Sequence, residues 1–242
     1  MIPVPEPLYA ALFRSLSERE SAETAADLAS DPSVAESVRR HYRRIDIVAE
    51  GALRTSTALA CQEGCSYCCH RWVMASPAEV FTVGEAILAT RGAERRGFIE
   101  RVHHNARRAR EASAQGDLHR APRCALLDDD DRCGAYEQRP SQCRRHHSTD
   151  LDACLSAYLD AFQAGQPFPS SRPYETVGAA AEAGLMQGLR QRGLETRRYE
   201  LQSALSEYLE DAFGCVARFV AGKPSFRHAM AGPSPASCPE AA

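Results

Sequence analysis

Residues 61–69 read CQEGCSYCC and residues 124–144 read CALLDDDDRCGAYEQRPSQCR, and the fold of this chain has to be built around these two stretches. Together they contain seven of the ten cysteines. The seven are Cys61, Cys65, Cys68, Cys69, Cys124, Cys133 and Cys143. Thiolates at such close spacing are what a soft metal ion or an iron–sulfur cluster requires. We therefore predict that all seven are metal ligands.

The spacing indicates several metal ions or a cluster. A turn of the length Cys65-x2-Cys68 lets two sulfurs point at one ion, whereas the adjacent side chains of Cys68 and Cys69 tend to point apart. The adjacent pair thus faces two different metals, or one of its thiols has a second role. Seven thiolates around one divalent ion would also leave a large buried negative charge. A polynuclear site and a [4Fe–4S] cluster with four cysteine ligands both fit the sequence.

Polar residues beside the cysteines are further candidates for the site. Guanidinium groups can offset negative charge and donate hydrogen bonds to sulfur, which applies to Arg71, Arg139 and Arg144. The candidate cofactor-binding residues are Tyr136, Arg139 and Arg144. Imidazole is a good zinc or iron ligand, and the nearest histidines are His70, His146 and His147. For the cysteines outside the two stretches, we expect Cys154 and Cys215 to pack in the core and Cys238 to be an incidental thiol.

The remaining composition is ordinary for a globular protein of 242 residues, with 44% apolar residues and a net charge of −3. Such a chain buries a core without disulfides, so its cysteines indicate metal or redox chemistry in a reducing cytoplasm. No secretory signal or membrane span is recognisable. The basic stretch 95–110 is interrupted by glutamates and has helical apolar spacing, which indicates a solvated helix. We therefore expect metal ions as partners, and neither a membrane nor nucleic acid.

Outside the two stretches the pattern is mainly helical, and it predicts a bundle-like frame around an irregular cysteine-rich core. We expect one or two short helices within 8–28, and single helices over 31–59, 77–89, 93–114, 149–163, 174–192 and 197–213. Ser76 and Glu79 form a capping box before the helix over 77–89. A short strand is expected at 72–74, and a small hairpin between Cys124 and Cys133 with an acidic tip at 128–131.

The same pattern divides the chain into four parts. Residues 1–60 form an N-terminal helical segment, and residues 61–147 form the bipartite metal-chelating core. Residues 148–221 supply C-terminal helices that pack on this core, and the Pro- and Gly-containing residues 222–242 form a disordered tail.

The order C-x3-C-x2-C-C, then C-x8-C-x2-Y-x2-R-P-x2-C-R, resembles the bacterial cysteine-cluster family with a zinc- or iron-chelating domain (YkgJ-type). The likeness runs from Cys61 to Arg144. It implies metal or iron–sulfur binding through the seven cysteines, with Tyr136, Arg139 and Pro140 on the family's other recurrent positions. The family includes a flagellin lysine N-methylase branch, which implies that an enzymatic role is open. This sequence has no Gly-rich nucleotide-binding loop and no βαβ pattern of the kind expected for a methyltransferase.

Three functions remain open from the sequence. The first is an iron–sulfur or iron centre with redox or cluster-dependent catalysis. The second is metal chelation for storage, delivery or sensing, with zinc as the alternative metal. The third is a helical interaction module with a structural zinc ion.

Overall fold

A computed structural model describes residues 6–31, 33–54, 58–117, 121–160 and 169–232. Over these residues the chain is mainly α-helical, as predicted. The helices are α1 (Glu6–Ser30), α2 (Val34–Arg54), α3 (Pro77–Ala89), α4 (Gly92–Gln115), α5 (Ser141–Arg145), α6 (Leu151–Leu159), α7 (Arg172–Gln191), α8 (Leu201–Glu210) and α9 (Ala212–Val220). Two short 3₁₀ helices are η1 (Tyr67–His70) and η2 (Tyr136–Gln138). Strand β1 (Met74–Ala75) pairs antiparallel with β2 (Tyr199–Glu200), and Met74 lies opposite Glu200.

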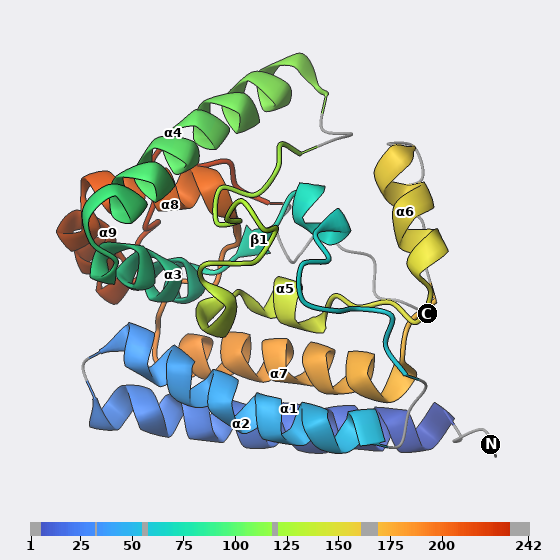
Figure 1. The fold of residues 1–242 in the computed structure, drawn as a ribbon. Helices are drawn as coiled ribbons and strands as arrows, with labels where there is room; N and C mark the ends of the chain where they lie inside the picture. Colours follow the sequence, from blue (N-terminus) through green and yellow to red (C-terminus); the bar gives the residue numbers. More distant parts are fainter. Residues whose placement is uncertain (1–5, 32, 55–57, 118–120, 161–168, 233–242) are drawn as a thin grey trace.

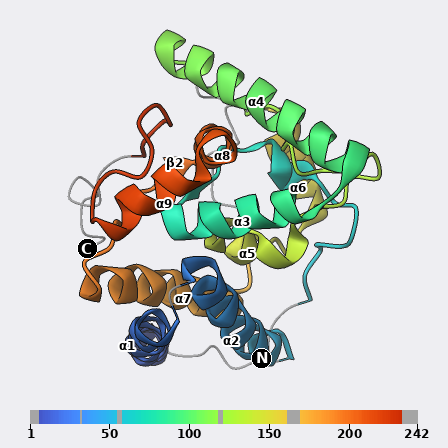
Figure 2. The same cartoon turned by 90° about the vertical axis from the view of Figure 1, so that its left-hand side faces the viewer.

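The helices form two groups with the cysteine segments between and beside them (Figures 1 and 2). Helices α1, α2 and α7 lie along one side of the molecule. Helices α3, α4, α8 and α9 form the other group, and the short α5 lies between α3 and α7 (Figure 2). Helix α6 stands apart from both groups and faces η1 (Figure 1). The loops that carry the cysteines are therefore held by helices from distant parts of the sequence.

Helix α1 packs on α7 through polar residues. Its buried positions are Ser17, Glu20, Ser21 and Thr24. They face the glycines of α7: an added Cβ at Gly184 would lie 2.6 Å from the Cβ of Glu20. Close backbone approach thus replaces the apolar stripe that amphipathic helices usually bury. The sequence predicts one or two short helices in this region, whereas the structure has a single helix of 25 residues.

An aromatic cluster forms the centre of the second group. Phe81 of α3 stacks on Tyr208 with ring centroids 5.2 Å apart, and it meets Phe219 and Phe226 edge-on. The predicted capping box of α3 is present: Ser76 Oγ accepts the N–H of Glu79, and Glu79 accepts the N–H of Ser76.

The C-terminal part differs from the expected arrangement in two places. The helix predicted over 197–213 is broken at Asp211, whose carboxylate accepts the N–H of Gly214 and starts α9. Of the expected tail 222–242, residues 222–232 lie against the core, since Ser225 and Phe226 are buried and Ala231 bridges Tyr199. Residues 233–242, which include Cys238, lie outside the described residues. Among the described helices, none combines the length and apolarity needed to cross a membrane.

Candidate metal centre

The first cysteine segment is a series of tight turns. Gly64 adopts a left-handed φ of 81°, which lets the amide of Cys65 turn back and donate to the carbonyl of Gln62. The 3₁₀ helix η1 then presents Cys68 and Cys69 on neighbouring positions. At the start of the segment, the N–H of Ser148 donates to Cys61 Sγ at 3.4 Å. This contact fixes Cys61 against the chain between α5 and α6.

The second cysteine segment is joined to the first by backbone pairing. The N–H of Cys124 donates to the carbonyl of Cys69 at 2.9 Å. The predicted hairpin follows, closed by an antiparallel bridge between Leu127 and Cys133. In its acidic tip, Asp128 Oδ1 accepts the N–H groups of Asp130 and Arg132, as expected for a solvated turn.

Helices α3 and α4 fix the position of the second segment. Arg101 of α4 donates to the carbonyl of Ala125, and Asn105 donates to the carbonyl of Arg123. Helix α4, which contains the basic stretch 95–110, therefore supports the hairpin through Arg101. Helix α5, which carries Cys143, is attached to α3, because the N–H of Ser141 donates to Glu79 Oε1 at 2.7 Å.

The structure brings the seven predicted cysteines into one neighbourhood. Cys68 acts electrostatically on sulfurs of both segments: Cys61, Cys65, Cys69, Cys133 and Cys143. Cys124 is coupled in the same way to Cys69, Cys133 and Cys143. In the described part of the chain, no three side chains of His, Cys, Asp or Glu converge closely enough to hold a metal ion. Metal binding therefore requires these neighbouring sulfurs to turn toward common points.

Burial and hydrogen bonding act in opposite directions on these thiols. Burial raises the pKa of Cys124 to about 12 and raises the pKa of Cys133 and Cys143. Backbone amides two residues ahead donate to the sulfurs of Cys65, Cys124 and Cys133 and favour the thiolate. The thiol of Cys69 donates to Cys68, which lowers the pKa of Cys68 and raises that of Cys69. A buried cation would offset the burial cost, while the amide donors are already in position.

An eighth cysteine lies beside this group. Cys154 acts electrostatically on Cys61 and Cys65, although the helical pattern around it predicts a core position. That interpretation was wrong, because α6 has no buried residue and Cys154 is only half-buried. Tyr158 connects α6 to η1 through ring contacts with Tyr67 and with His70. The missed signal was the position of Cys154, eleven residues after Cys143, next to leucines that proved to be exposed.

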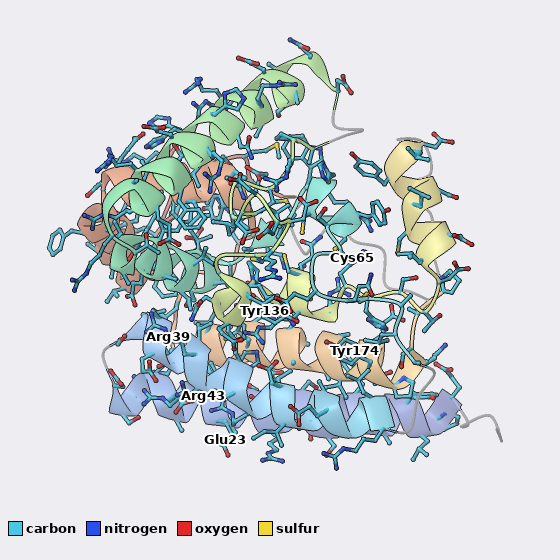
Figure 3. The ribbon with its side chains drawn as sticks, viewed as in Figure 1. Glu23, Arg39, Arg43, Cys65, Tyr136 and Tyr174 are labelled. Atoms are coloured by element: carbon cyan, nitrogen blue, oxygen red, sulfur yellow. The ribbon has the colours of Figure 1, made fainter. Side chains whose placement is uncertain are left out.

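The arginines differ in how they meet the cysteines. Arg139 lies 3.6 Å over the ring of Tyr136, and its charge lowers the pKa of Cys68. Within the described residues its Nη1 is buried without a hydrogen-bond partner, so this donor is available to a sulfur atom. The ring of Tyr136 is 58% exposed, so the pair lies at the edge of the site. In Figure 3, Cys65 and Tyr136 both lie between α4 and the layer of α1, α2 and α7.

Arg144 is engaged with α2. Its Nη1 lies 2.6 and 2.8 Å from the carboxylate oxygens of Asp46, and its guanidinium covers the ring of Tyr42 at 4.1 Å. Its Nε and Nη2 donate to the carbonyls of Arg139 and Glu137. These contacts tie the second cysteine segment to the N-terminal helices.

The three candidate histidines have different surroundings. His147 uses both ring nitrogens: Nδ1 donates to the carbonyl of Arg145, and Nε2 accepts the N–H of Ser171. Burial, followed by the charge of Arg71, lowers the pKa of His146 to about 4, so its ring is neutral. His70 lies 4.9 Å from the ring of Tyr158. The contacts of His147 make it a structural residue, whereas His146 contacts Arg71 and His70 contacts Tyr158.

The donor set suits zinc or iron, because it is rich in sulfur and supplied with amide and guanidinium donors. Comparison with known proteins points the same way. Residues 60–163 match the model of the CxxCxxCC family, described as "Putative zinc- or iron-chelating domain". No curated protein and no solved structure matches the chain. Less than half of the chain is matched, and this part, which contains both cysteine segments and Cys154, is similar to a zinc- or iron-chelating domain.

Proposed function

We propose that this protein binds zinc or iron through eight cysteines in two groups of four. The first group is Cys61, Cys65, Cys68 and Cys154, and the second is Cys69, Cys124, Cys133 and Cys143. Two observations support this division: Cys154 acts electrostatically on Cys61 and Cys65, and Cys124 is coupled to Cys69, Cys133 and Cys143. Cys68 acts on cysteines of both groups, so it lies where the two groups meet, and we assign it to the first group through its effect on Cys61 and Cys65. Cys68 and Cys69 then belong to different groups. This assignment agrees with the tendency of adjacent side chains to point in different directions.

Charge supports two centres over one. Two divalent ions offset half of the negative charge of eight thiolates. The guanidinium groups of Arg71 and Arg139 offset part of the remainder, since both lower the pKa of Cys68. When bound, such metals supply either a rigid cross-link or, as iron–sulfur clusters, an electron carrier. Thiols of this kind persist in a reducing compartment, so we propose the cytoplasm as the location.

Metal chelation without turnover is the role that the number of sulfur ligands supports best. The four cysteines of the second group are all half-buried, and four sulfur ligands would fill the coordination of a tetrahedral ion and leave no position for a substrate. A second candidate is redox or cluster-dependent catalysis, favoured by the exposed ring of Tyr136 against Arg139. These two residues would then contact a substrate beside the first group.

Anaerobic purification followed by elemental analysis, absorbance and Mössbauer spectroscopy tests the proposal. We expect two metal centres per chain; a brown iron–sulfur chromophore identifies clusters, and colourless protein with two zinc ions identifies chelation. Cys154→Ser and Cys133→Ser should each lose one centre and retain the other. Cys215→Ala is the control, because Cys215 lies on α9 against Arg218 and should not affect metal content.

Three results would contradict parts of this proposal. Wild-type protein without stoichiometric metal refutes metal binding. Full metal content in Cys154→Ser removes Cys154 from the ligand set. Loss of both centres in every cysteine variant, with the fold intact, replaces two groups by one polynuclear site.

A further inference from the structure

The start of α8 is fixed to the end of the first cysteine segment. Strand β1 begins four residues after the end of η1 and pairs with β2, which leads into α8. The N–H of Leu201 donates to the carbonyl of Val73 at 2.8 Å. The first turn of α8 therefore cannot move independently of the chain that carries Cys68 and Cys69. This turn lies outside the matched residues 60–163.

Gln202 in this turn points at a cysteine sulfur. Glu200 caps the helix by accepting the N–H groups of Gln202 and Ser203 at 2.9 and 2.7 Å. The side chain of Gln202 is thereby directed to Cys124, and its Nε2 lies 3.6 Å from Cys124 Sγ. The residue is 7% exposed.

The carbonyl oxygen of the Gln202 amide shows that burying this side chain is energetically unfavourable. Among the described residues, Gln202 Oε1 is buried without a hydrogen-bond partner. Leaving a buried acceptor unpaired is destabilising, and an apolar side chain of the same length avoids this cost. Packing alone would therefore favour methionine at this position. The amide is explained if its N–H group stabilises a charged sulfur.

We propose that Gln202 is a positioning residue of the metal centre, whose amide orients Cys124 Sγ and stabilises it as a thiolate ligand. The inference rests on the proposed metal binding and extends it to α8. Hydrogen bonds from outside the ligand set fix the ligand's direction and tune metal affinity, and their loss typically weakens binding 10- to 100-fold. The helices after the chelating segment thus take part in metal binding.

Anaerobic titration with Co²⁺ tests this role, because the sulfur-to-cobalt charge-transfer bands report both affinity and thiolate character. Gln202→Met removes the donor and retains the length of the side chain. In this variant we expect the affinity of the second cysteine group for Co²⁺ to fall about 10- to 100-fold. The sulfur-to-cobalt charge-transfer band should also shift. Gln202→Glu should weaken binding further, because a carboxylate repels the thiolate. Urea unfolding of the metal-free variants measures whether the fold is retained.

Ser206→Ala provides the matched control on the same helix. Ser206 is buried, and its hydroxyl contacts His103 at 2.8 Å; among the described residues its hydroxyl has no hydrogen bond to a cysteine. Its affinity and spectrum should equal those of the wild type. Wild-type affinity and band position in both Gln202 variants would overturn the role of Gln202 alone, and so would an equal loss in Ser206→Ala. Failure of the wild type to bind Co²⁺ and Zn²⁺ would overturn both proposals.

Discussion

Replacing Arg144 by methionine should destabilise the protein far more than removing its acidic partner. Arg144 has an exposed side-chain fraction of 9%, and Asp46 has one of 45%. The guanidinium also donates to the carbonyls of Glu137 and Arg139 and covers the ring of Tyr42. It is therefore the main cross-link between α2 and the chain that leads to Cys143.

The magnitude follows from these contacts. A half-exposed ion pair contributes about 0.2–1 kcal/mol after solvent screening. Each hydrogen bond from a charged group to a partly buried carbonyl contributes up to about 1.5–3 kcal/mol, and the contact with the tyrosine ring adds about 1–2 kcal/mol. Because such contributions are not additive, we expect a total of about 3–5 kcal/mol for Arg144→Met. In a chain of this size the melting temperature should fall by about 6–20 °C.

Urea denaturation of metal-free protein measures the free energy of unfolding for each variant. Asp46→Ala should cost at most about 1 kcal/mol, since the carbonyl contacts survive. Arg144→Lys should give an intermediate loss, because an ammonium cannot reproduce the planar fork of the guanidinium. Arg43→Met is the control: its pair with Glu36 is 62% exposed on the arginine side and should contribute almost nothing. The reasoning is refuted if Arg144→Met costs less than about 1 kcal/mol, or no more than Asp46→Ala.

Three further outcomes follow from other parts of the molecule. Gly184→Ala should cost about 1–3 kcal/mol, because the added Cβ meets Glu20 at 2.6 Å and the backbone of α1 at 2.8 Å. Gly51→Ala, a helical position with nothing within 4 Å, should stabilise by about 0.5–1 kcal/mol, and thermal melting compares the two. Burial raises the pKa of Glu20, but His41 and Arg44 outweigh it and leave that pKa below its usual range. Its stabilisation is thus present above about pH 4.3, the usual glutamate value, and is lost as pH falls through the lower folded-state pKa. Urea midpoints between pH 7 and pH 3 should fall less steeply in Glu20→Gln, and an equal slope contradicts the assignment. Removal of bound metal with a chelator should lower the melting temperature of the wild type and leave that of Cys133→Ser less affected; equal shifts contradict a metal at Cys133.

Much of the candidate site was predictable because its signals are local. The spacing of Cys61 to Cys69 and the hairpin between Cys124 and Cys133 depend on turns of a few residues. The capping box of Ser76 and Glu79 likewise forms within four residues. Backbone hydrogen bonds of this range are set by residue type alone, so the sequence predicted them correctly.

Other features required the packed molecule. The polar face of α1 has no apolar period, and its burial depends on glycines of α7 more than 150 residues away. The proximity of Cys154 to Cys61 depends on how α6 folds back onto η1. The contact of Gln202 with Cys124 depends on the pairing of two strands that are far apart in the chain.

The sequence by itself therefore determined that this protein is mainly helical and that seven cysteines lie in two local segments. Only the tertiary structure decided that the two cysteine segments lie side by side, that Cys154 lies beside them, and that Arg144 is bound to α2. The physical reason is the range of the interactions. Turns and caps are stabilised by neighbours along the chain, whereas the environment of a buried thiol is set by side chains that meet only after the helices have packed.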